Sequence, residues 1–188
     1  MPSKKEVEIK FRIAHAGTLA QKLRRTAFRL VTPRTHEMNT LYDLPSQPLR
    51  RHGEILRLRE YGKQWVLTHK AKGTAGPHKT RAESEVKIDD GVQMDAILRA
   101  LGFAPAFRYE KFRAEWSDGK GHVVIDHTPL GDLGEIEGPP RWIDRTAKLL
   151  GIRKEEYITQ SYGELFLQWK RRTHSRATEM TFKAIGNS

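Results

Sequence analysis

Charged side chains occupy alternate positions in most of the segments that read as β-strands. Residues 6–13 show the pattern most clearly, because four apolar side chains alternate there with four ionic ones, Glu6, Glu8, Lys10 and Arg12. Successive side chains of a strand point to opposite faces of its sheet, so each such segment has one apolar face and one ionic face. The fold must therefore bury the apolar face and still accommodate a densely ionic one.

Two arrangements of the strands satisfy this pattern. In the first, an antiparallel sheet covers a core with its apolar face and leaves the ionic face in solvent. In the second, the sheet closes into a barrel with an ionic interior, and amphipathic helices cover its apolar exterior. Exposed strand faces usually mix Thr, Ser and Gln with their charges, whereas nearly every position on these faces is ionic. The pattern therefore favours the barrel.

Turn residues divide the chain into about eight strands and four helices. The predicted strands cover residues 6–13, 30–42, 54–60, 64–72, 81–88, 107–116, 121–126 and 133–138. The predicted helices cover residues 18–27, 91–101, 141–150 and 161–172. Most strands are joined by local connections, which suit antiparallel pairing. We therefore expect an α+β fold, an eight-stranded antiparallel barrel with a charged interior and helices outside.

The 188 residues of the chain correspond to about one domain. We expect that domain to span residues 1–170, followed by a basic, flexible tail over residues 171–188. The chain has 34 basic and 23 acidic residues, and its net charge of +11 favours an anionic partner such as nucleic acid, an acidic membrane surface or a polyphosphate. It contains no cysteine, which excludes disulfides, iron–sulfur clusters, cysteine-bound zinc and thiol catalysis.

No apolar run approaches the roughly 20 residues of a membrane span, and the first residues do not resemble a secretory leader. We therefore expect a soluble, cytoplasmic protein. An interior full of charge is costly unless ligands neutralise it. Basic side chains around a cavity suit a polyanion, and Mg²⁺ typically binds one or two carboxylates together with phosphate oxygens. The pattern thus predicts a site for a metal–polyphosphate complex.

Short charged motifs along the chain resemble, in order, those of the CYTH domain family, also called the triphosphate tunnel metalloenzymes. The segment from Glu6 to Lys10 resembles the family's E-x-E-x-K signature. Further resemblances follow at residues 56–59, 65–70, 81–85, 110–113, 124–137 and 161–165. Together they span about residues 5–167. The resemblance implies a barrel that forms a tunnel and an enzyme that acts on a triphosphate.

The resemblance also implies roles for individual charged residues. Seven basic residues would bind the triphosphate oxygens: Lys10, Arg57, Arg59, Lys70, Arg81, Lys111 and Arg113. Five acidic residues would hold one or two Mg²⁺ or Mn²⁺ ions: Glu6, Glu8, Asp126, Glu135 and Glu137. Glu83 and Glu85 would orient the basic side chains or hold metal-bound water. Asn39 stands where many members have an aspartate, which puts one metal or water contact in question.

The family includes class IV adenylate cyclases and several kinds of triphosphatase, and both activities fit this chain. A cyclase would convert ATP to cyclic AMP and pyrophosphate. A triphosphatase would hydrolyse tripolyphosphate, thiamine triphosphate or a nucleoside triphosphate, and Tyr42 with Lys70 would then activate water. A third alternative is a non-catalytic protein that binds polyphosphate or the 5′-triphosphate of RNA. We expect a small-molecule triphosphate as the partner, with no membrane or nucleic acid; a homodimer is left open.

Overall fold

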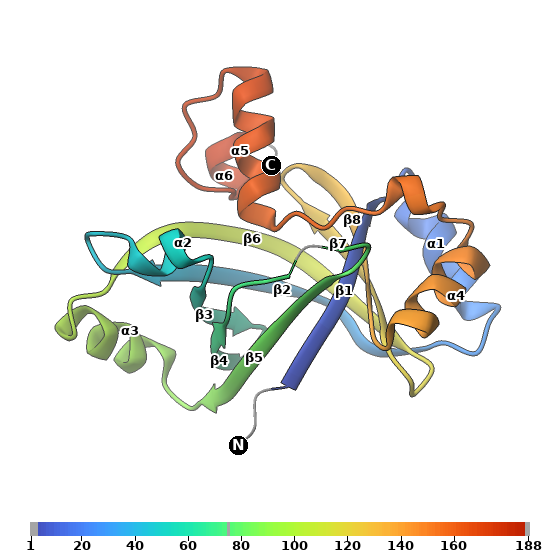
Figure 1. Ribbon diagram of the computed structural model, residues 1–188, viewed down its shortest axis with the longest axis horizontal. Helices are drawn as coiled ribbons and strands as arrows, with labels where there is room; N and C mark the ends of the chain where they lie inside the picture. Colours follow the sequence, from blue (N-terminus) through green and yellow to red (C-terminus); the bar gives the residue numbers. More distant parts are fainter. Residues whose placement is uncertain (1–3, 75, 187–188) are drawn as a thin grey trace.

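Eight antiparallel strands close into a barrel in the computed structural model, which describes residues 4–74 and 76–186 (Figure 1). The strands are β1 (Lys4–Arg12), β2 (Arg29–Asp43), β3 (Ile55–Tyr61), β4 (Gln64–Lys70), β5 (Lys79–Ile88), β6 (Ala104–Ser117), β7 (His122–Thr128) and β8 (Gly131–Glu137). Their order around the barrel is β1-β5-β4-β3-β2-β6-β7-β8, and β8 pairs with β1 to close it. The predicted eight-stranded antiparallel barrel is confirmed.

Six α-helices accompany the barrel within the described residues. They are α1 (Ala16–Arg24), α2 (Pro48–His52), α3 (Gly91–Ala100), α4 (Pro140–Leu150), α5 (Tyr162–Thr173) and α6 (Phe182–Ile185). The four longer helices coincide with those predicted from the sequence to within a few residues. Neither α2 nor α6 was predicted, because helices of five and four residues are too short to show a hydrophobic period. None of the helices in the described parts of the chain is long and apolar enough to cross a membrane.

The apolar face of β1 lies outside the barrel, under α1 and α4. Ile9 of β1 is fully buried in a cluster that includes Leu23 of α1 and Ile143 of α4. Burying each such side chain stabilises the fold by about 1.5–3 kcal/mol. Gly134 of β8 allows Phe11 to lie flat on the sheet, since a Cβ at residue 134 would approach the Phe11 ring to 2.1 Å. The alternation in β1 therefore has the predicted meaning for Glu6, Glu8 and Lys10, which line the interior, whereas Arg12 at the end of the strand is exposed.

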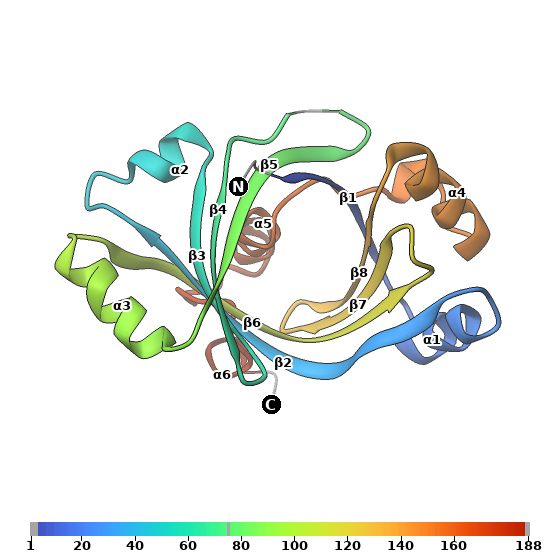
Figure 2. The ribbon, with the colours of Figure 1, turned by 90° about the horizontal axis from the view of Figure 1, so that it is seen from below.

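Two smaller apolar clusters fix the helices that lie nearer the ends of the barrel. Leu98 of α3 packs with Leu58 of β3, and Leu165 of α5 packs with Leu133 of β8. In Figure 1, α5 stands over one end of the barrel, and in the view from below its ribbon lies within the ring of strands (Figure 2). The N-terminal turn of α5 is thereby held over one opening of the barrel.

The segment after α5 returns to the barrel wall. Its backbone pairs with β6, where the Met180 N–H donates to the Arg108 carbonyl at 2.9 Å, and the Met180 side chain is fully buried. The Phe182 N–H donates to the Glu110 carboxylate at 2.8 Å. The sequence predicts a flexible tail from residue 171, whereas here α5 continues to Thr173 and the chain then docks on β6. The sequence analysis missed this contact because a single buried methionine produces no periodic hydrophobic pattern.

Candidate active site

The barrel encloses a cavity of about 960 Å³ that is lined by side chains from all eight strands. Among the described residues, eight basic side chains line it: Lys10, Arg57, Arg59, Lys70, Lys79, Arg81, Lys111 and Arg113. Seven acidic side chains also line it: Glu6, Glu8, Glu83, Glu85, Glu115, Glu135 and Glu137. All seven basic residues that the sequence analysis assigned to phosphate binding therefore face one space. Because acidic and basic groups nearly balance, the net positive charge of the chain lies mostly outside the cavity.

Asp126 on β7 lies next to the cavity and pairs with two of the basic side chains that line it. Its two oxygens accept from Arg113, with Nε 2.8 Å from Oδ1 and Nη2 2.7 Å from Oδ2. Lys111 Nζ lies 3.0 Å from Oδ2, and the Tyr162 hydroxyl donates to the same oxygen at 2.5 Å. Asp126 is fully buried. Both oxygens are thus already engaged by donors, so a metal ion at Asp126 would have to displace at least one of them.

Glu37 on β2 is a second fully buried carboxylate, and the sequence analysis did not assign it. Its oxygens lie 3.5 Å from Lys111 Nζ and 3.8 Å from Arg113 Nε, and Asn39 donates to it at 2.8 Å. Burial raises the pKa of Glu37, but the surrounding cations outweigh burial and lower that pKa to about 2. The available signal was that Glu37 and Asn39, two residues apart in a predicted strand, share a face.

The charged side chains of β1 form ion pairs within the strand, with Glu135 of β8 and with Lys70 of β4. Lys10 Nζ lies 2.5 Å from Glu8 Oε1 and 3.3 Å from Glu135 Oε1 of β8. Burial raises the pKa of Glu8, and Lys10 more than offsets it, so the pKa falls below its usual value. The Lys70 ammonium contacts Glu6 at 2.7 Å, and there burial prevails and raises the pKa of Glu6.

Glu85 on β5 contacts the side chains that the sequence analysis expected it to orient. Its Oε2 lies 3.3 Å from Arg59 Nη2 and 3.7 Å from Arg57 Nη2. The Thr68 hydroxyl donates to the same oxygen at 3.1 Å and accepts from Arg57 at 3.2 Å. Glu83 lies 3.3 Å from Lys70 Nζ. These contacts suit an orienting role, which stays a prediction.

Two assigned residues are not among those that line the cavity: Asp126, which is buried against Arg113 and Lys111, and Tyr42, which lies on the outer face of the barrel. Tyr42 packs outside the barrel with Leu58 and Leu98, and its hydroxyl donates to Asp95 of α3. The pairing of β2 with β6 shifts register between Leu41 and Tyr42, and Leu41 lines the cavity. Because successive side chains alternate, Tyr42 must point outward where Leu41 points inward. The structure therefore does not bring Tyr42 to Lys70, so these two residues do not form the expected water-activating pair.

Tyr162 at the start of α5 closes one end of the cavity. Lys10 Nζ and Lys111 Nζ lie 5.5 Å and 4.5 Å from the centroid of its ring, distances typical of cation–π contacts. Ser161 caps α5 in a reciprocal arrangement with Glu164, which fixes the first turn of the helix and so the position of the ring. Burial, reinforced by Asp126, raises the pKa of the Tyr162 hydroxyl well above its usual value. The motif at residues 161–165 predicted the start of this helix but not that Tyr162 closes the cavity.

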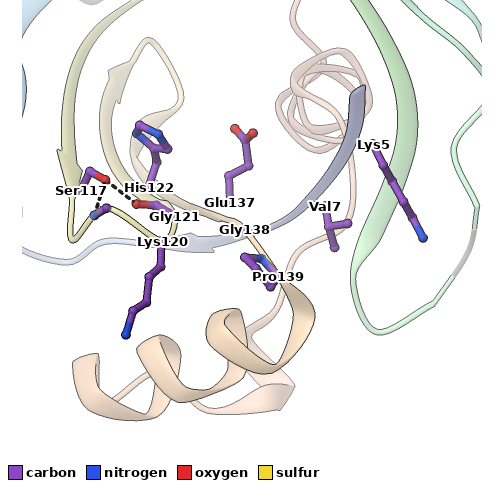
Figure 3. Close-up of a pocket in the computed structure, with 10 residues that line it drawn as sticks. Lys5, Val7, Ser117, Lys120, Gly121, His122, Glu137, Gly138 and Pro139 are labelled. Atoms are coloured by element: carbon purple, nitrogen blue, oxygen red, sulfur yellow. Dashed lines mark hydrogen bonds between the residues drawn. The ribbon is translucent and has the colours of Figure 1, made fainter. Parts of the chain in front are cut away.

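A smaller cavity of about 360 Å³ lies between the β6–β7 turn and the start of α4 (Figure 3). It shares Glu137 and His122 with the main cavity, so these two residues mark the boundary between the spaces. Figure 3 shows both side chains pointing to the same side, away from α4. Glu137 stands directly opposite Glu8 of β1 in the strand register. Two carboxylates facing each other across paired strands repel unless a cation lies nearby.

The predicted metal ligands do not form a preformed metal-binding site among the described residues. Within residues 4–74 and 76–186, no group of three acidic or histidine side chains is gathered closely enough to hold an ion. The reason is that Glu6, Glu8, Asp126 and Glu135 each hold a lysine or arginine instead. Their chemistry is nevertheless that of hard oxygen donors, which divalent Mg²⁺ and Mn²⁺ prefer.

Comparison with known proteins gives a consistent assignment. Residues 4–162 match the family profile described as the CYTH domain. A Methanocaldococcus jannaschii protein, provisionally named an adenylate cyclase, is 29% identical over 171 residues, which cover 85% of this chain and 97% of that protein.

Two solved structures share the fold. A Vibrio parahaemolyticus protein, also provisionally named an adenylate cyclase, superposes with a TM-score of 0.78 at 18% identity, covering 88% of this chain and 99% of that one. A Hippeastrum protein, provisionally named an adenylyl cyclase and described as having a dominant triphosphatase activity, gives a TM-score of 0.64 at 18% identity, covering 87% and 96%. At these identities the structural likeness shows the fold alone.

Proposed function

Because this chain belongs to the CYTH domain family, we propose that its barrel binds the triphosphate of a nucleotide, or an inorganic triphosphate, and catalyses a reaction at a phosphorus atom of it. The enzymes of this family are adenylate cyclase-like or triphosphatases. The observation that carries the proposal is the cavity itself, where seven basic side chains assigned from motifs far apart in the sequence line one enclosed space. We propose adenylate cyclase activity first and triphosphatase activity as the alternative.

The ion pairs of the cavity suggest how a highly charged substrate can enter it. Six of the eight basic side chains lie within 4.0 Å of a carboxylate oxygen, for example Lys10 at Glu8 and Lys70 at Glu6. A triphosphate oxygen can replace each carboxylate, and arginines such as Arg113 suit bidentate contacts with phosphate. The carboxylates so released would be left buried and unpaired, which is costly without a new counter-charge.

A divalent cation, Mg²⁺ or Mn²⁺, would supply that counter-charge. The residues that would hold it are the carboxylates Glu6, Glu8, Asp126, Glu135 and Glu137. Their donor atoms fit, since all are hard oxygens, and Glu8 and Glu137 already stand opposite each other. When bound, the cation would stabilise negative charge on the phosphoryl oxygens. Phosphate oxygens would thus replace the carboxylates at the basic side chains, and the cation would pair with the released carboxylates. The interior would stay close to neutral.

The two activities differ in the nucleophile. In a cyclase the ribose 3′-hydroxyl attacks the α-phosphorus and pyrophosphate leaves, whereas in a triphosphatase water attacks a terminal phosphorus and orthophosphate leaves. In the cyclase the nucleophile is part of the substrate, so binding the triphosphate also positions the 3′-hydroxyl, and its proton passes to the leaving pyrophosphate or to solvent. The outward position of Tyr42 removes the tyrosine that a Tyr42–Lys70 pair would use on water, which supports the cyclase. The Hippeastrum protein, described as a dominant triphosphatase on the same fold, keeps the alternative open.

A product assay distinguishes these activities. Metal-stripped protein receives ATP or tripolyphosphate with Mg²⁺ and then Mn²⁺, and the products are separated by chromatography. Cyclic AMP with an equal amount of pyrophosphate supports the cyclase. Orthophosphate, formed mainly from tripolyphosphate and without cyclic AMP, supports the triphosphatase. Tight binding without any product would instead support a non-catalytic polyphosphate or RNA-end binder.

Several expectations from the sequence stay predictions beside this proposal. They are the single domain over residues 1–170, the cytoplasmic location and the absence of a nucleic-acid partner, and whether the chain forms a homodimer stays open.

A further inference from the structure

Two of the basic side chains in the cavity lack the acidic partner that the other six have. Among the described residues, no carboxylate oxygen lies within 4.0 Å of the side-chain nitrogens of Lys79 or Arg81. In addition, Arg81 Nε is buried without any hydrogen-bond partner. Lys79 and Arg81 are two residues apart on β5, so both point to the same, inward face of that strand. The unpaired positive charge of the cavity is therefore concentrated at one place on its wall.

Lys79 is held in an unfavourable position for a cation. Only 9% of it is exposed, and its neighbours on the wall include the cations Lys10 and Arg81. Glu8 stands opposite Lys79 in the strand register, but its carboxylate is committed to Lys10 at 2.5 Å. Glu164 of α5 also faces this side, and it is engaged in capping that helix. A buried ammonium without an acidic partner costs free energy of folding, and a bound anion would recover that cost.

The loop that follows β4 holds Arg81 in place. A Cβ at Gly73 would lie 2.9 Å from Arg81 Nε, so the loop backbone lies directly against the guanidinium. Thr74 bridges to Thr80 beside it, with the Thr74 N–H donating to the Thr80 carbonyl at 2.9 Å. The guanidinium is thus confined by backbone on one side and open to the cavity on the other.

We propose that Lys79 and Arg81 form the anchoring subsite of the cavity, which binds one phosphate group of the polyphosphate ligand before any other ion pair is broken. Side chains at such positions are roughly 7 Å apart along a strand, and a phosphate or diphosphate group between them can accept hydrogen bonds from both. The inference rests on the proposed function and extends it. Lys79 becomes a substrate-binding residue that no motif revealed, and inorganic pyrophosphate alone becomes a ligand even without metal.

Calorimetric titration of metal-stripped protein with pyrophosphate and with tripolyphosphate tests the subsite. Replacing Lys79 by Met should weaken both ligands about ten- to hundred-fold, the usual effect of losing a charged hydrogen bond, while Lys79→Arg should retain most of the affinity. Lys87→Met is the matched control, because Lys87 lies on the same face of β5 by strand alternation but is exposed and outside the cavity lining. It should leave both affinities unchanged.

Thermal unfolding without ligand supplies an independent readout. Lys79→Met removes an unpaired buried charge, so its melting temperature should equal or exceed that of the unaltered protein. Lys70→Met leaves Glu6 buried without its partner and should melt lower. Weaker binding together with undiminished stability is the expected signature of a ligand-binding lysine.

The outcomes separate this inference from the proposed function. If the unaltered protein binds neither anion and turns over no triphosphate, the proposed function is wrong. If it binds tripolyphosphate but Lys79→Met binds equally well, the function stands and the anchoring subsite is wrong. If Lys79→Met both binds normally and melts lower, Lys79 is a structural residue and the inference is overturned.

Discussion

The wall of the cavity built by β6 and β7 and the wall built by β5 contain the same kinds of residue in opposite states. On the first wall, Arg113 and Lys111 are saturated by Asp126 and Glu37 at distances down to 2.7 Å. On the second, Lys79 and Arg81 have no acidic partner within 4.0 Å among the described residues. Facing the cavity is therefore not enough to make a lysine or arginine available to a ligand. On the first wall the cations are already neutralised by carboxylates, whereas on the second Lys79 and Arg81 are available to bind an anion.

The largest effect should follow from removing carboxylates between the two walls. Glu8→Ala with Glu137→Ala should abolish turnover, about a thousand-fold or more, and weaken the binding of Mg²⁺ and Mn²⁺, because the two proposed metal ligands are lost. The measurements are initial rates and metal titrations, with circular dichroism to check the fold. The control is Glu155→Ala with Glu156→Ala, which removes two exposed carboxylates. Undiminished metal-dependent activity in the first double variant would refute the metal assignment.

The saturated wall should be the more important one for stability. Asp126→Asn breaks the bidentate pair with Arg113 and weakens that with Lys111, and it should destabilise the protein by about 3–5 kcal/mol, as expected for a buried charge network. Urea unfolding measures this change. Asp132→Asn, which breaks a partly exposed pair with His127, should cost less than about 1 kcal/mol. Equal losses in the two variants would show that burial of the network does not matter.

Acid should weaken the same wall through Glu37. Its pKa is about 2 in the folded protein against an ordinary value of 4.5, so its contribution is fully present above pH 4.5 and is lost as pH falls towards 2. The contribution is roughly 3 kcal/mol for such a shift. Unfolding free energies of the unaltered protein and of Glu37→Gln, measured between pH 7 and pH 3, should converge as pH falls. A constant difference across that range would contradict the assigned pairing.

The smallest effect should come from Tyr42, on the outer face of the barrel. Tyr42→Phe removes the hydrogen bond to Asp95 and should cost about 1 kcal/mol of stability. Its turnover should stay within about twofold of the unaltered enzyme. A catalytic proton-transfer residue would instead lose a hundred-fold or more on this change, and such a loss would restore Tyr42 to the site.

Strand alternation predicts which face a side chain occupies but not which charges it meets there. The faces of β1 and β5 follow from counting by twos, and the cavity holds the side chains assigned to them, from Glu6 to Lys10 and from Arg81 to Glu85. Counting by twos also separates Tyr42 from Asn39, since they are three residues apart, but a motif-based role outweighed that signal. Glu37 and Lys79 were missed because their significance depends on which cations and carboxylates lie opposite them, which requires the strand register.

The alternation of ionic and apolar residues is enough to assign each strand one ionic and one apolar face, because side-chain direction along a strand depends only on position. Barrel closure and the family resemblance followed from that pattern and from the charged motifs. Which of these charges pair depends on how the barrel brings the strands together. Lys10 of β1 pairs with Glu135 of β8, a neighbour only because the barrel closes. Lys70 of β4 pairs with Glu6 of β1 across the intervening strand β5. The interaction between two buried charges depends steeply on their separation. Strand register and barrel closure set those separations, and they leave Lys79 and Arg81 without a nearby carboxylate among the described residues.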